Sequence, residues 1–143
     1  MTELYALAAE VGGVVCGTEN FSEYHLGYFT LHGDAASDIE PAHGYFKSEV
    51  WKMAGHFALP QDIISQIPSA GLWLGQTDEG ELGFRYPVAD AVIKWFASYN
   101  WMDKLGITQD EVGRVVAQIK RTDHKRRAKP TWCYPGRFDF VPA

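Results

Sequence analysis

The sequence predicts an α/β domain that is mostly helical and has one or two parallel strands. Apolar residues recur at helical spacing in several segments, whereas VVCG at residues 14–17 is the one firm candidate for a buried strand. Residues 37–40 are a weaker candidate for a second strand. A strand that leads through GTEN into a helix is the βα step of an α/β fold. With 143 residues, 46% apolar and 22% charged, the chain has the composition of one globular domain.

The first two predicted helices are defined by their ends. Residues 2–11 carry apolar side chains at helical spacing and are followed by Gly12, a common helix-ending residue. After the predicted strand, Asn20 and Glu23 have the three-residue spacing of a capping box, which starts a second helix. Residues 31–44 have no periodicity and are expected to form a loop.

The remaining helices are predicted from periodicity and from prolines. Residues 46–59 have helical spacing, Pro60 starts a short helix and Pro87 a longer one. Thr108 and Glu111 form another capping box, followed by a stripe of branched apolar residues. Ala89, Val92, Ile93 and Phe96 are expected to face inward, and Val112, Val115, Val116 and Ile119 form the stripe. The apolar residues at helical spacing in the earlier helices are Leu4, Leu7, Ala8, Val11, Val50, Met53, Ala54 and Phe57.

Charge is distributed unevenly along the chain. Residues 1–119 carry 6 Lys/Arg and 16 Asp/Glu, a balance of −10; residues 120–143 carry 7 and 2, a balance of +5, and the two sum to −5. A basic tail of this kind binds nucleic acid, folds back on its own acidic domain or reaches a phosphorylated small ligand. Only Trp132 and Tyr134 accompany the charges of the tail, so we expect no nucleic-acid partner.

The chain has the sequence features of a cytoplasmic protein. No apolar run approaches the length of a membrane span, and Met1 is not followed by a basic region and an apolar one. Cys16 and Cys133 have neither a nearby partner nor zinc-type spacing, which suits a reducing compartment. We therefore expect a cytoplasmic protein with no membrane partner.

Residues 69–84, SAGLWLGQTDEGELGF, combine acidic residues, glycines and apolar residues in one short stretch. The acidic residues are too polar for a core strand, whereas Leu72, Trp73 and Leu74 are too apolar for a loop without contacts. Glycines supply the backbone freedom of a segment that changes shape or lies close to a ligand. These features leave two interpretations open: a surface loop pinned by its apolar residues, and a loop with a function.

The segments CGTENFSEYHLGYFTLHGD, DIEP, FKSEVWKMA, IPSAGLWLGQTDEGELGF and TDHKRR follow one another along the chain. Through them the sequence resembles the NAD synthetases over roughly residues 2–129. The resemblance implies an ATP-dependent carbon–nitrogen ligase of NAD biosynthesis, in the ATP pyrophosphatase superfamily. In that family ATP adenylates the nicotinate carboxylate of deamido-NAD, and ammonia then displaces AMP to give NAD. It also implies Mg²⁺, a homodimer, and the C-terminal portion of a Rossmann-like adenine nucleotide alpha hydrolase fold.

The resemblance implies an ATP site at the end of the predicted strand, where ligands of open α/β sheets gather. Thr18 resembles a threonine that contacts ATP, and Lys47 and Ser69 resemble residues that hold its phosphates. Glu23 resembles a Mg²⁺ ligand, with the capping box as the alternative role. Lys47 is alternatively a solvated lysine, although the first turn of a helix is an unfavourable place for a cation, and Ser69 an ordinary turn residue.

A deamido-NAD site is implied by four further positions. Asp38 resembles an aspartate that contacts this substrate, and Asp34 lies in the same loop, where a plain turn-forming role is equally open. His124 and Lys125 match the His-Lys pair of the family. The alternative for this basic segment is a frayed helix end favoured by the helix dipole, which applies to residues 126–129.

The same resemblance implies that residues 69–84 form a lid that closes over the ATP site when substrates bind. Closure would exclude water and protect the acyl-adenylate from hydrolysis. Gly75, Gly80 and Gly83 are the expected hinges, and Leu72 with Trp73 the expected apolar grip. The lid residues expected at the site are Trp73, Gln76, Asp78 and Glu79.

The family's phosphate loop, Ser-Gly-Gly-x-Asp-Ser, belongs upstream of the first predicted helix and has no counterpart here. We therefore expect residues 1–143 to be the C-terminal part of an NAD synthetase domain without its N-terminal part. One hypothesis is an enzyme component that acts on deamido-NAD, ATP and ammonia together with the missing half or a homodimer partner. The other is a truncated, non-catalytic remnant or interaction module that pairs with an intact synthetase.

Overall fold

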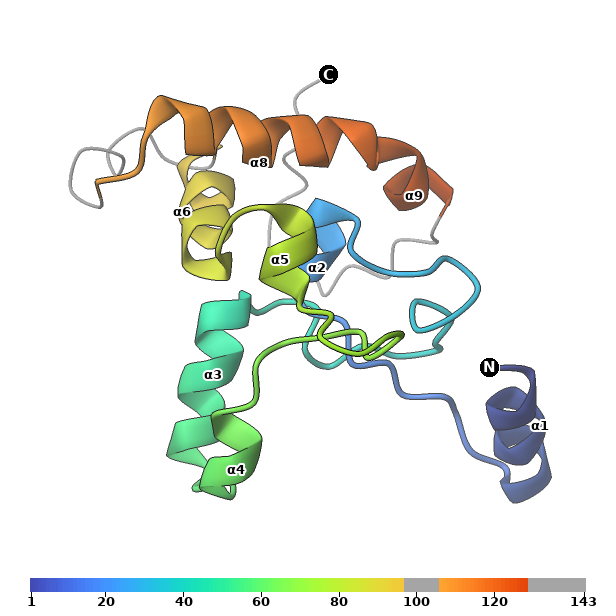
Figure 1. Ribbon diagram of the computed structural model, residues 1–143. Helices are drawn as coiled ribbons and strands as arrows, with labels where there is room; N and C mark the ends of the chain where they lie inside the picture. Colours follow the sequence, from blue (N-terminus) through green and yellow to red (C-terminus); the bar gives the residue numbers. More distant parts are fainter. Residues whose placement is uncertain (97–105, 129–143) are drawn as a thin grey trace.

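A computed structural model describes residues 1–96 and 106–128 (Figure 1). α8 packs across α6 and α2, α3 and α4 extend away from α8, and α1 stands apart at the end of an extended segment. No helix in the described ranges is long and apolar enough to cross a membrane. The helices are α1 (Thr2–Val11), α2 (Phe21–Leu26), α3 (Lys47–His56), α4 (Gln61–Ile64), α5 (Asp78–Leu82), α6 (Tyr86–Phe96), α8 (Gln109–Arg121) and α9 (Asp123–Ala128).

The two predicted strand segments meet, but they form no sheet within the described ranges. Cys16 and Ile39 make an isolated parallel bridge, with Gly17 N–H donating to Ile39 O at 2.8 Å. Of VVCG, Val15 is buried while the residues on both sides of it are exposed, so the expectation of a buried strand is wrong. The Asp38 carboxylate, rather than a neighbouring strand, accepts the Val15 N–H at 2.8 Å.

The hydrophobic core lies where α2, α6 and α8 meet. Leu26, Tyr86, Val92 and Val115 are almost completely buried there. The predicted inward faces of α6 and α8 are confirmed by the burial of Ala89, Val92, Ile93, Val112 and Val115. The residues of the predicted helical spacing and stripe that are partly buried are Val50, Met53, Ala54, Val116 and Ile119. The side chain of Phe96 lies outside the described part of the structure.

Both predicted capping boxes are present. Asn20 Oδ1 accepts the Glu23 N–H and Glu23 Oε2 accepts the Asn20 N–H, each at 3.0 Å. Thr108 Oγ1 accepts the Glu111 N–H at 3.2 Å, and Glu111 Oε2 accepts the Thr108 N–H at 2.9 Å. Pro60 directly precedes α4, as its N-cap rather than its first residue. These helix starts are therefore decided by neighbouring residues along the chain.

The apolar face predicted for α1 exists, but no described residue covers it. Leu4, Leu7 and Val11 are each more than half exposed, and α1 contains no buried residue. Phe57, which follows α3, is similarly exposed. The helical spacing of these four residues is therefore not accompanied by burial within the described ranges. Periodicity predicts which residues share a helix face, and a separate tertiary contact decides whether that face is covered.

Burial predicts different costs for the same substitution at two leucines. Leu26→Ala removes a side chain that is 0% exposed and is expected to lower the free energy of unfolding by about 2–5 kcal/mol. Leu4→Ala, at a side chain that is 52% exposed, is the matched control and is expected to cost no more than about 0.5 kcal/mol. Urea unfolding followed by circular dichroism measures both. Equal costs for the two variants would contradict the assignment of the core.

Candidate functional site

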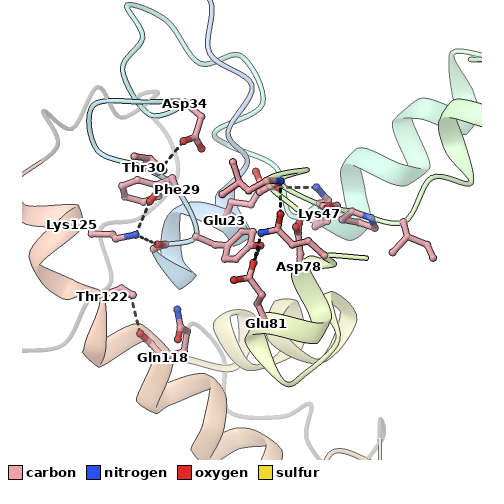
Figure 2. Close-up of a pocket in the computed structure, with 18 of the residues that line it drawn as sticks. Glu23, Phe29, Thr30, Asp34, Lys47, Asp78, Glu81, Gln118, Thr122 and Lys125 are labelled. Atoms are coloured by element: carbon pink, nitrogen blue, oxygen red, sulfur yellow. Dashed lines mark hydrogen bonds and ion pairs between the residues drawn. The ribbon is translucent and has the colours of Figure 1, made fainter. Parts of the chain in front are cut away.

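A cavity of about 960 Å³ lies between the ends of α2 and α3, residues 66–72, α5 and the corner between α8 and α9 (Figure 2). Its wall combines carboxylates, basic groups, hydroxyls and aromatic rings, as in sites for small polar ligands. It thereby brings together segments that are distant in the sequence. The predicted site residues that line it are Glu23, Asp34, Lys47, Ser69, Gln76, Asp78, His124 and Lys125.

Lys47 and Glu23 form an ion pair on the wall of this cavity. Lys47 Nζ lies 2.7 Å from Glu23 Oε1, and each side chain is less than a fifth exposed. The same Nζ lies 5.2 Å from the centroid of the Tyr86 ring, a favourable position for a cation. The other carboxylate oxygen of Glu23 accepts the Asn20 N–H. A capping role and a ligand-binding role for Glu23 thus use different oxygens and are compatible.

Asp90 on α6 holds the start of α3 in place. Its carboxylate is 3% exposed; Oδ1 accepts a short hydrogen bond from Ser22 Oγ, and Oδ2 accepts the Ser48 N–H at 3.0 Å. Ser22 Oγ in turn accepts the Lys47 N–H at 2.9 Å. Phe46, which precedes the helix, has no side-chain acceptor, so these two side chains satisfy the first backbone donors of α3. They also set the direction in which Lys47 leaves the backbone.

Asp78 places a buried carboxylate on the cavity wall. It is 4% exposed, and Oδ2 accepts a hydrogen bond from Tyr86 Oη at 2.9 Å. Oδ1 is buried and has no hydrogen-bond partner among residues 1–96 and 106–128. Burial, followed by the charges of Glu23 and Asp78, raises the pKa of the Tyr86 hydroxyl, which therefore remains a donor. A buried carboxylate oxygen of this kind is costly unless a donor or a cation reaches it.

Glu81 links α5 to the segment after α2. Its Oε2 accepts hydrogen bonds from Tyr28 Oη at 2.5 Å and from Gln76 Nε2 at 2.7 Å. The bond from Tyr28, and next that from Gln76, lowers the pKa of the Glu81 carboxyl. Gln76 Oε1 accepts the Leu72 N–H at 2.7 Å. One chain of hydrogen bonds therefore connects the α2 side of the cavity to the exposed loop before α5.

The predicted lid, residues 69–84, consists of two different structures. Residues 69–75 are an exposed loop in which Leu72 is 76% exposed and Trp73 55%. The second part is α5, which begins after Thr77, whose Oγ1 accepts the Gly80 N–H at 3.1 Å. The apolar grip expected from Leu72 and Trp73 is therefore absent in this conformation.

The structure also bears on the predicted hinge glycines and on the lid residues expected at the site. Gly80 lies inside α5, so the hinge predicted there falls within a helix rather than in a loop. Gly83 ends α5 with a left-handed backbone, φ 76°. Trp73 and Glu79 do not line the cavity; Glu79 Oε1 instead accepts the Tyr86 N–H at 2.8 Å.

Lys125 fixes the backbone that follows α2. Its Nζ donates to Gly27 O at 2.9 Å and to Phe29 O at 2.6 Å. Gly27 has a φ of 61°, and a Cβ there would lie 2.3 Å from Thr122 Cβ, so only glycine fits. His124 is exposed and lines the cavity. Of the predicted pair, His124 is an exposed residue of the cavity lining, while Lys125 supports the wall through its two hydrogen bonds.

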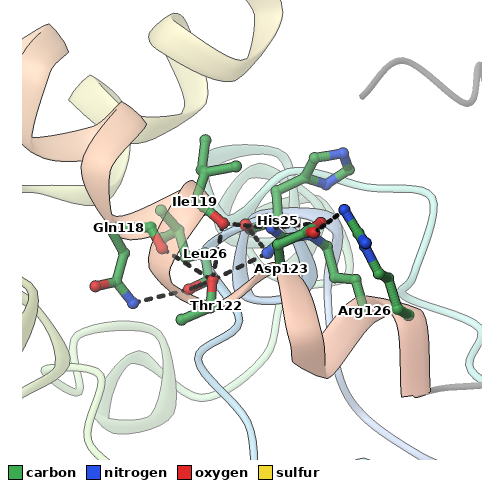
Figure 3. A network of polar contacts seen from close by, with 8 residues as sticks. His25, Leu26, Gln118, Ile119, Thr122, Asp123 and Arg126 are labelled. Carbon is green, nitrogen blue, oxygen red and sulfur yellow. Dashed lines mark hydrogen bonds and ion pairs between the residues drawn. The ribbon is translucent and has the colours of Figure 1, made fainter. Parts of the chain in front are cut away.

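Arg126 joins α9 to α2 and α8 (Figure 3). Its side chain is buried; Nη1 donates to His25 O at 2.7 Å and to Thr122 Oγ1 at 3.0 Å, and Nη2 donates to Ile119 O. The expectation of a frayed helix end at this residue is therefore wrong, because its acceptors lie on distant elements. Residues 129–143 of the predicted basic tail lie outside the described residues.

Three predicted site residues differ in their relation to the cavity. Thr18 is exposed, and neither it nor Asp38 lines the cavity. Asp38 instead accepts the Val15 N–H, as described above. Asp34 does line the cavity, and its Oδ1 accepts the Thr30 N–H at 2.9 Å. Asp34 therefore has a turn-forming hydrogen bond and a position at the site at the same time.

Sequence reasoning missed several residues that line or support the cavity. Asp90 carried a detectable signal, because it is a carboxylate within the predicted inward-facing run from Ala89 to Ile93. The others were not singled out by residue type or spacing, since tertiary packing brings them to the site. They are Tyr28, Thr30, Glu81, Gln118 and Arg121.

Solved structures share this arrangement of helices. The NMN synthetase from Francisella tularensis superposes with a TM-score of 0.73 and 34% sequence identity, over 96% of this chain and 52% of that one. The NH3-dependent NAD synthetase from Campylobacter jejuni superposes with a TM-score of 0.66 and 24% identity, over 87% of this chain and 48% of that one, which supports the fold alone. The fold is thus consistent with the helical portion of an α/β nucleotide-binding protein.

The sequence matches point to a particular family. Residues 1–129 match the family described as NAD synthase. The NH(3)-dependent NAD(+) synthetases of Pyrococcus horikoshii and Methanosarcina mazei are 44% and 40% identical, over 89% and 91% of this chain but only 51% and 52% of their own lengths. The chain therefore belongs to the NAD synthase family, as its sequence motifs predicted. It spans about half the length of the curated relatives it matches.

His25 makes the stability of this helical unit depend on pH. Burial lowers its pKa from 6.5 to about 4, so the unfolded chain takes up a proton at a higher pH than the folded chain. The stabilisation that comes from keeping His25 neutral is fully present above pH 6.5. The free energy of unfolding should therefore fall by up to roughly 3 kcal/mol as the pH drops from 6.5 to 4. Urea unfolding across this range measures the slope. His25→Gln should remove most of it and His32→Gln, at an exposed histidine, should not; the same slope in both variants would contradict the assignment.

Proposed function

We propose that this chain forms one side of the active site of an NAD synthetase, which joins ammonia to the nicotinate carboxylate of deamido-NAD at the expense of ATP. The observation that supports this proposal best is the cavity wall, on which Lys47, Glu23 and Ser69 meet from three separate segments. His124 and Lys125 of α9 line the same cavity, and Figure 2 labels Lys125 there. Basic groups beside a carboxylate suit a nucleotide triphosphate that binds together with a cation.

The proposed reaction has two steps. A carboxylate oxygen of deamido-NAD attacks the α-phosphorus of ATP, and the bond from that phosphorus to pyrophosphate breaks. Ammonia then attacks the adenylated carbonyl carbon, loses a proton, and AMP leaves with the electrons of the broken carbon–oxygen bond. Lys47 is assigned to neutralise the charge that builds on pyrophosphate, and the Ser69 hydroxyl to bind a phosphate oxygen. Thr18 is assigned a contact with ATP outside the described cavity wall.

The donor groups on the wall fit the Mg²⁺ that this reaction class uses. Glu23 and Asp78 both line the cavity, and Asp78 Oδ1 is buried with no hydrogen-bond partner among the described residues. Oxygen donors shared with phosphates are the ligands that Mg²⁺ prefers, and the bound ion would supply positive charge to the phosphates. Glu23 and Asp78 are the residues that would hold the ion, and Lys47, now paired with Glu23, would be the residue that binds a phosphate.

The deamido-NAD contacts are assigned to His124, Lys125, Asp34 and Asp38. His124 and Asp34 are both exposed on the wall and thus available to a ligand. Lys125 is already bonded to two backbone carbonyls after α2, so we assign it a supporting role in the shape of the site. Asp34 is held at the rim by its bond to the Thr30 N–H.

We propose that activity requires a segment equivalent to the part of the relatives that residues 1–143 do not cover. A homodimer is the expected assembly. Positioning supplies most of the rate in phosphoryl and nucleotidyl transfer, so a site with one wall is not expected to turn over. The alternative is a non-catalytic chain that pairs with an intact synthetase. Exposed apolar residues on α1 are compatible with either kind of partner.

Lys47→Ala, in an enzyme completed with the uncovered half, is expected to lower kcat for amide formation roughly 10²–10³-fold, because it removes the cation beside the leaving pyrophosphate. Lys52→Ala is the matched control, since Lys52 is exposed on the same helix and does not line the cavity. Amide formation is measured with deamido-NAD, ATP and ammonia. Nicotinate mononucleotide is tested as a second acid, because one solved relative is named an NMN synthetase.

Each outcome of this assay has a distinct meaning. Equal rates for the two lysine variants would contradict the role of Lys47. Residues 1–143 alone should give no turnover above that of their own Lys47→Ala variant, and clear turnover would contradict the requirement for a second half. A completed enzyme that is folded and binds ATP but forms no amide would favour the non-catalytic alternative.

The loop and α5 should respond differently to ligands. Residues 69–75 are exposed and are expected to gain protection from hydrogen exchange when ATP and deamido-NAD bind. The α5 segment is already anchored through Asp78 and Glu81 and should change little. Hydrogen-exchange mass spectrometry of the completed enzyme, with and without both ligands, measures the two segments together. Unchanged protection at residues 69–75 would contradict a closing loop.

A further inference from the structure

Glu19, Glu40 and His43 bring two carboxylates and an imidazole together outside the cavity. One ligand atom from each lies within 4.8 Å of the other two, and none of the three residues lines the cavity. Two atoms bound to one ion at about 2.1 Å lie up to about 4.2 Å apart, so a small adjustment lets all three share an ion. Glu19 is 5% exposed, and the side chains of Glu40 and His43 are 10% and 16% exposed.

The imidazole and one carboxylate meet in a geometry that suits a shared ion. His43 Nδ1 lies 2.7 Å from Glu40 Oε2, yet this buried nitrogen has no hydrogen-bond partner in the described part of the chain. The contact therefore lacks the direction of a hydrogen bond. With a protonated imidazole this contact is an ion pair; with a neutral imidazole that has no proton on Nδ1, the nitrogen and the carboxylate oxygen can both direct lone pairs at a third point, where a cation binds.

The groups around these side chains hold them in position without a metal. Glu40 Oε1 accepts a hydrogen bond from Ser37 Oγ at 2.8 Å, and the His43 N–H donates to Glu40 O at 3.1 Å across a turn. The His43 ring packs edge-on against Tyr24, with 4.6 Å between ring centroids. Supporting contacts of this kind orient ligands in metal sites and limit what ion binding must rearrange.

We propose that Glu19, Glu40 and His43 bind a divalent first-row transition-metal ion, with Zn²⁺ as the probe. Imidazole favours such ions over Mg²⁺, and two carboxylates offset the charge of the ion. The site joins the segment before α2 to the turn before α3, the two segments that lead to Glu23 and Lys47. Its proposed role is to hold these segments together. The proposal is independent of the proposed function, because it concerns none of the cavity residues.

The test uses the 143-residue chain with any affinity tag removed, since a polyhistidine tag binds Zn²⁺. Isothermal titration with Zn²⁺ is expected to give one ion per chain, and Glu40→Gln and His43→Asn should each weaken binding roughly tenfold or more. Glu10→Gln and His32→Asn are matched controls at exposed positions. Cys16→Ser tests whether the exposed thiol takes part. Each of these control variants should bind like the wild type.

Two results would overturn the proposal. No stoichiometric Zn²⁺ binding would leave an ordinary ion pair between Glu40 and His43. Binding that is lost in Cys16→Ser or His32→Asn but kept in His43→Asn would place the ion elsewhere. If a ligand variant fails to fold by circular dichroism, nitrogen NMR of the wild type decides instead: Zn²⁺ should shift the imidazole resonances of His43, and unchanged resonances would reject the site.

Discussion

The arrangement of helices around the cavity depends on one buried carboxylate, that of Asp90. Asp90 belongs to α6, and its carboxylate accepts hydrogen bonds from the Ser22 hydroxyl on α2 and from the Ser48 N–H at the start of α3. A buried carboxylate is costly unless both oxygens are hydrogen-bonded, so the three helices are stable together only in the arrangement that satisfies it. The core between α2, α6 and α8 forms in that same arrangement. The bonds that Asp90 makes also fix the start of α3, and with it the position of Lys47.

The same interaction accounts for a lysine in the first turn of a helix, where the positive end of the helix dipole opposes it. Three carboxylates contact this helix start. Asp90 binds the backbone, Glu49 Oε2 accepts the Phe46 N–H at 2.9 Å, and Glu23 pairs with the Lys47 ammonium. The local misfit visible in the sequence is therefore balanced by tertiary contacts, and the ammonium group remains on the cavity wall. That is the physical basis for assigning it a phosphate.

Sequence reasoning succeeded where neighbours along the chain decide the structure, as at the caps of α2 and α8 and in the inward faces of α6 and α8. It failed where the deciding partner is distant. The sequence predicts Arg126 to be a helix-end cation, since its acceptors on α2 and α8 are not apparent from its neighbours along the chain. The predicted strand at residues 14–17 forms a single bridge and no sheet within the described residues. At the candidate site, family resemblance supplied the roles proposed for Lys47 and Glu23, but the support from Asp90 and the link from Tyr28 to Glu81 follow only from packing.

The exposed apolar side chains divide the chain into two kinds of structure. α2, α6 and α8 share a core of their own, whereas α1, the turn after α3 and residues 72–74 expose large apolar groups. The matched relatives are about twice as long as this chain. In our proposal, the second half would cover these exposed apolar surfaces. A self-contained core explains why the cavity wall at Lys47, Glu23 and Asp78 is already in position. The loop at residues 69–75 and α1 lie outside this core, so under our proposal their exposed apolar groups are the ones that a ligand or a partner would cover.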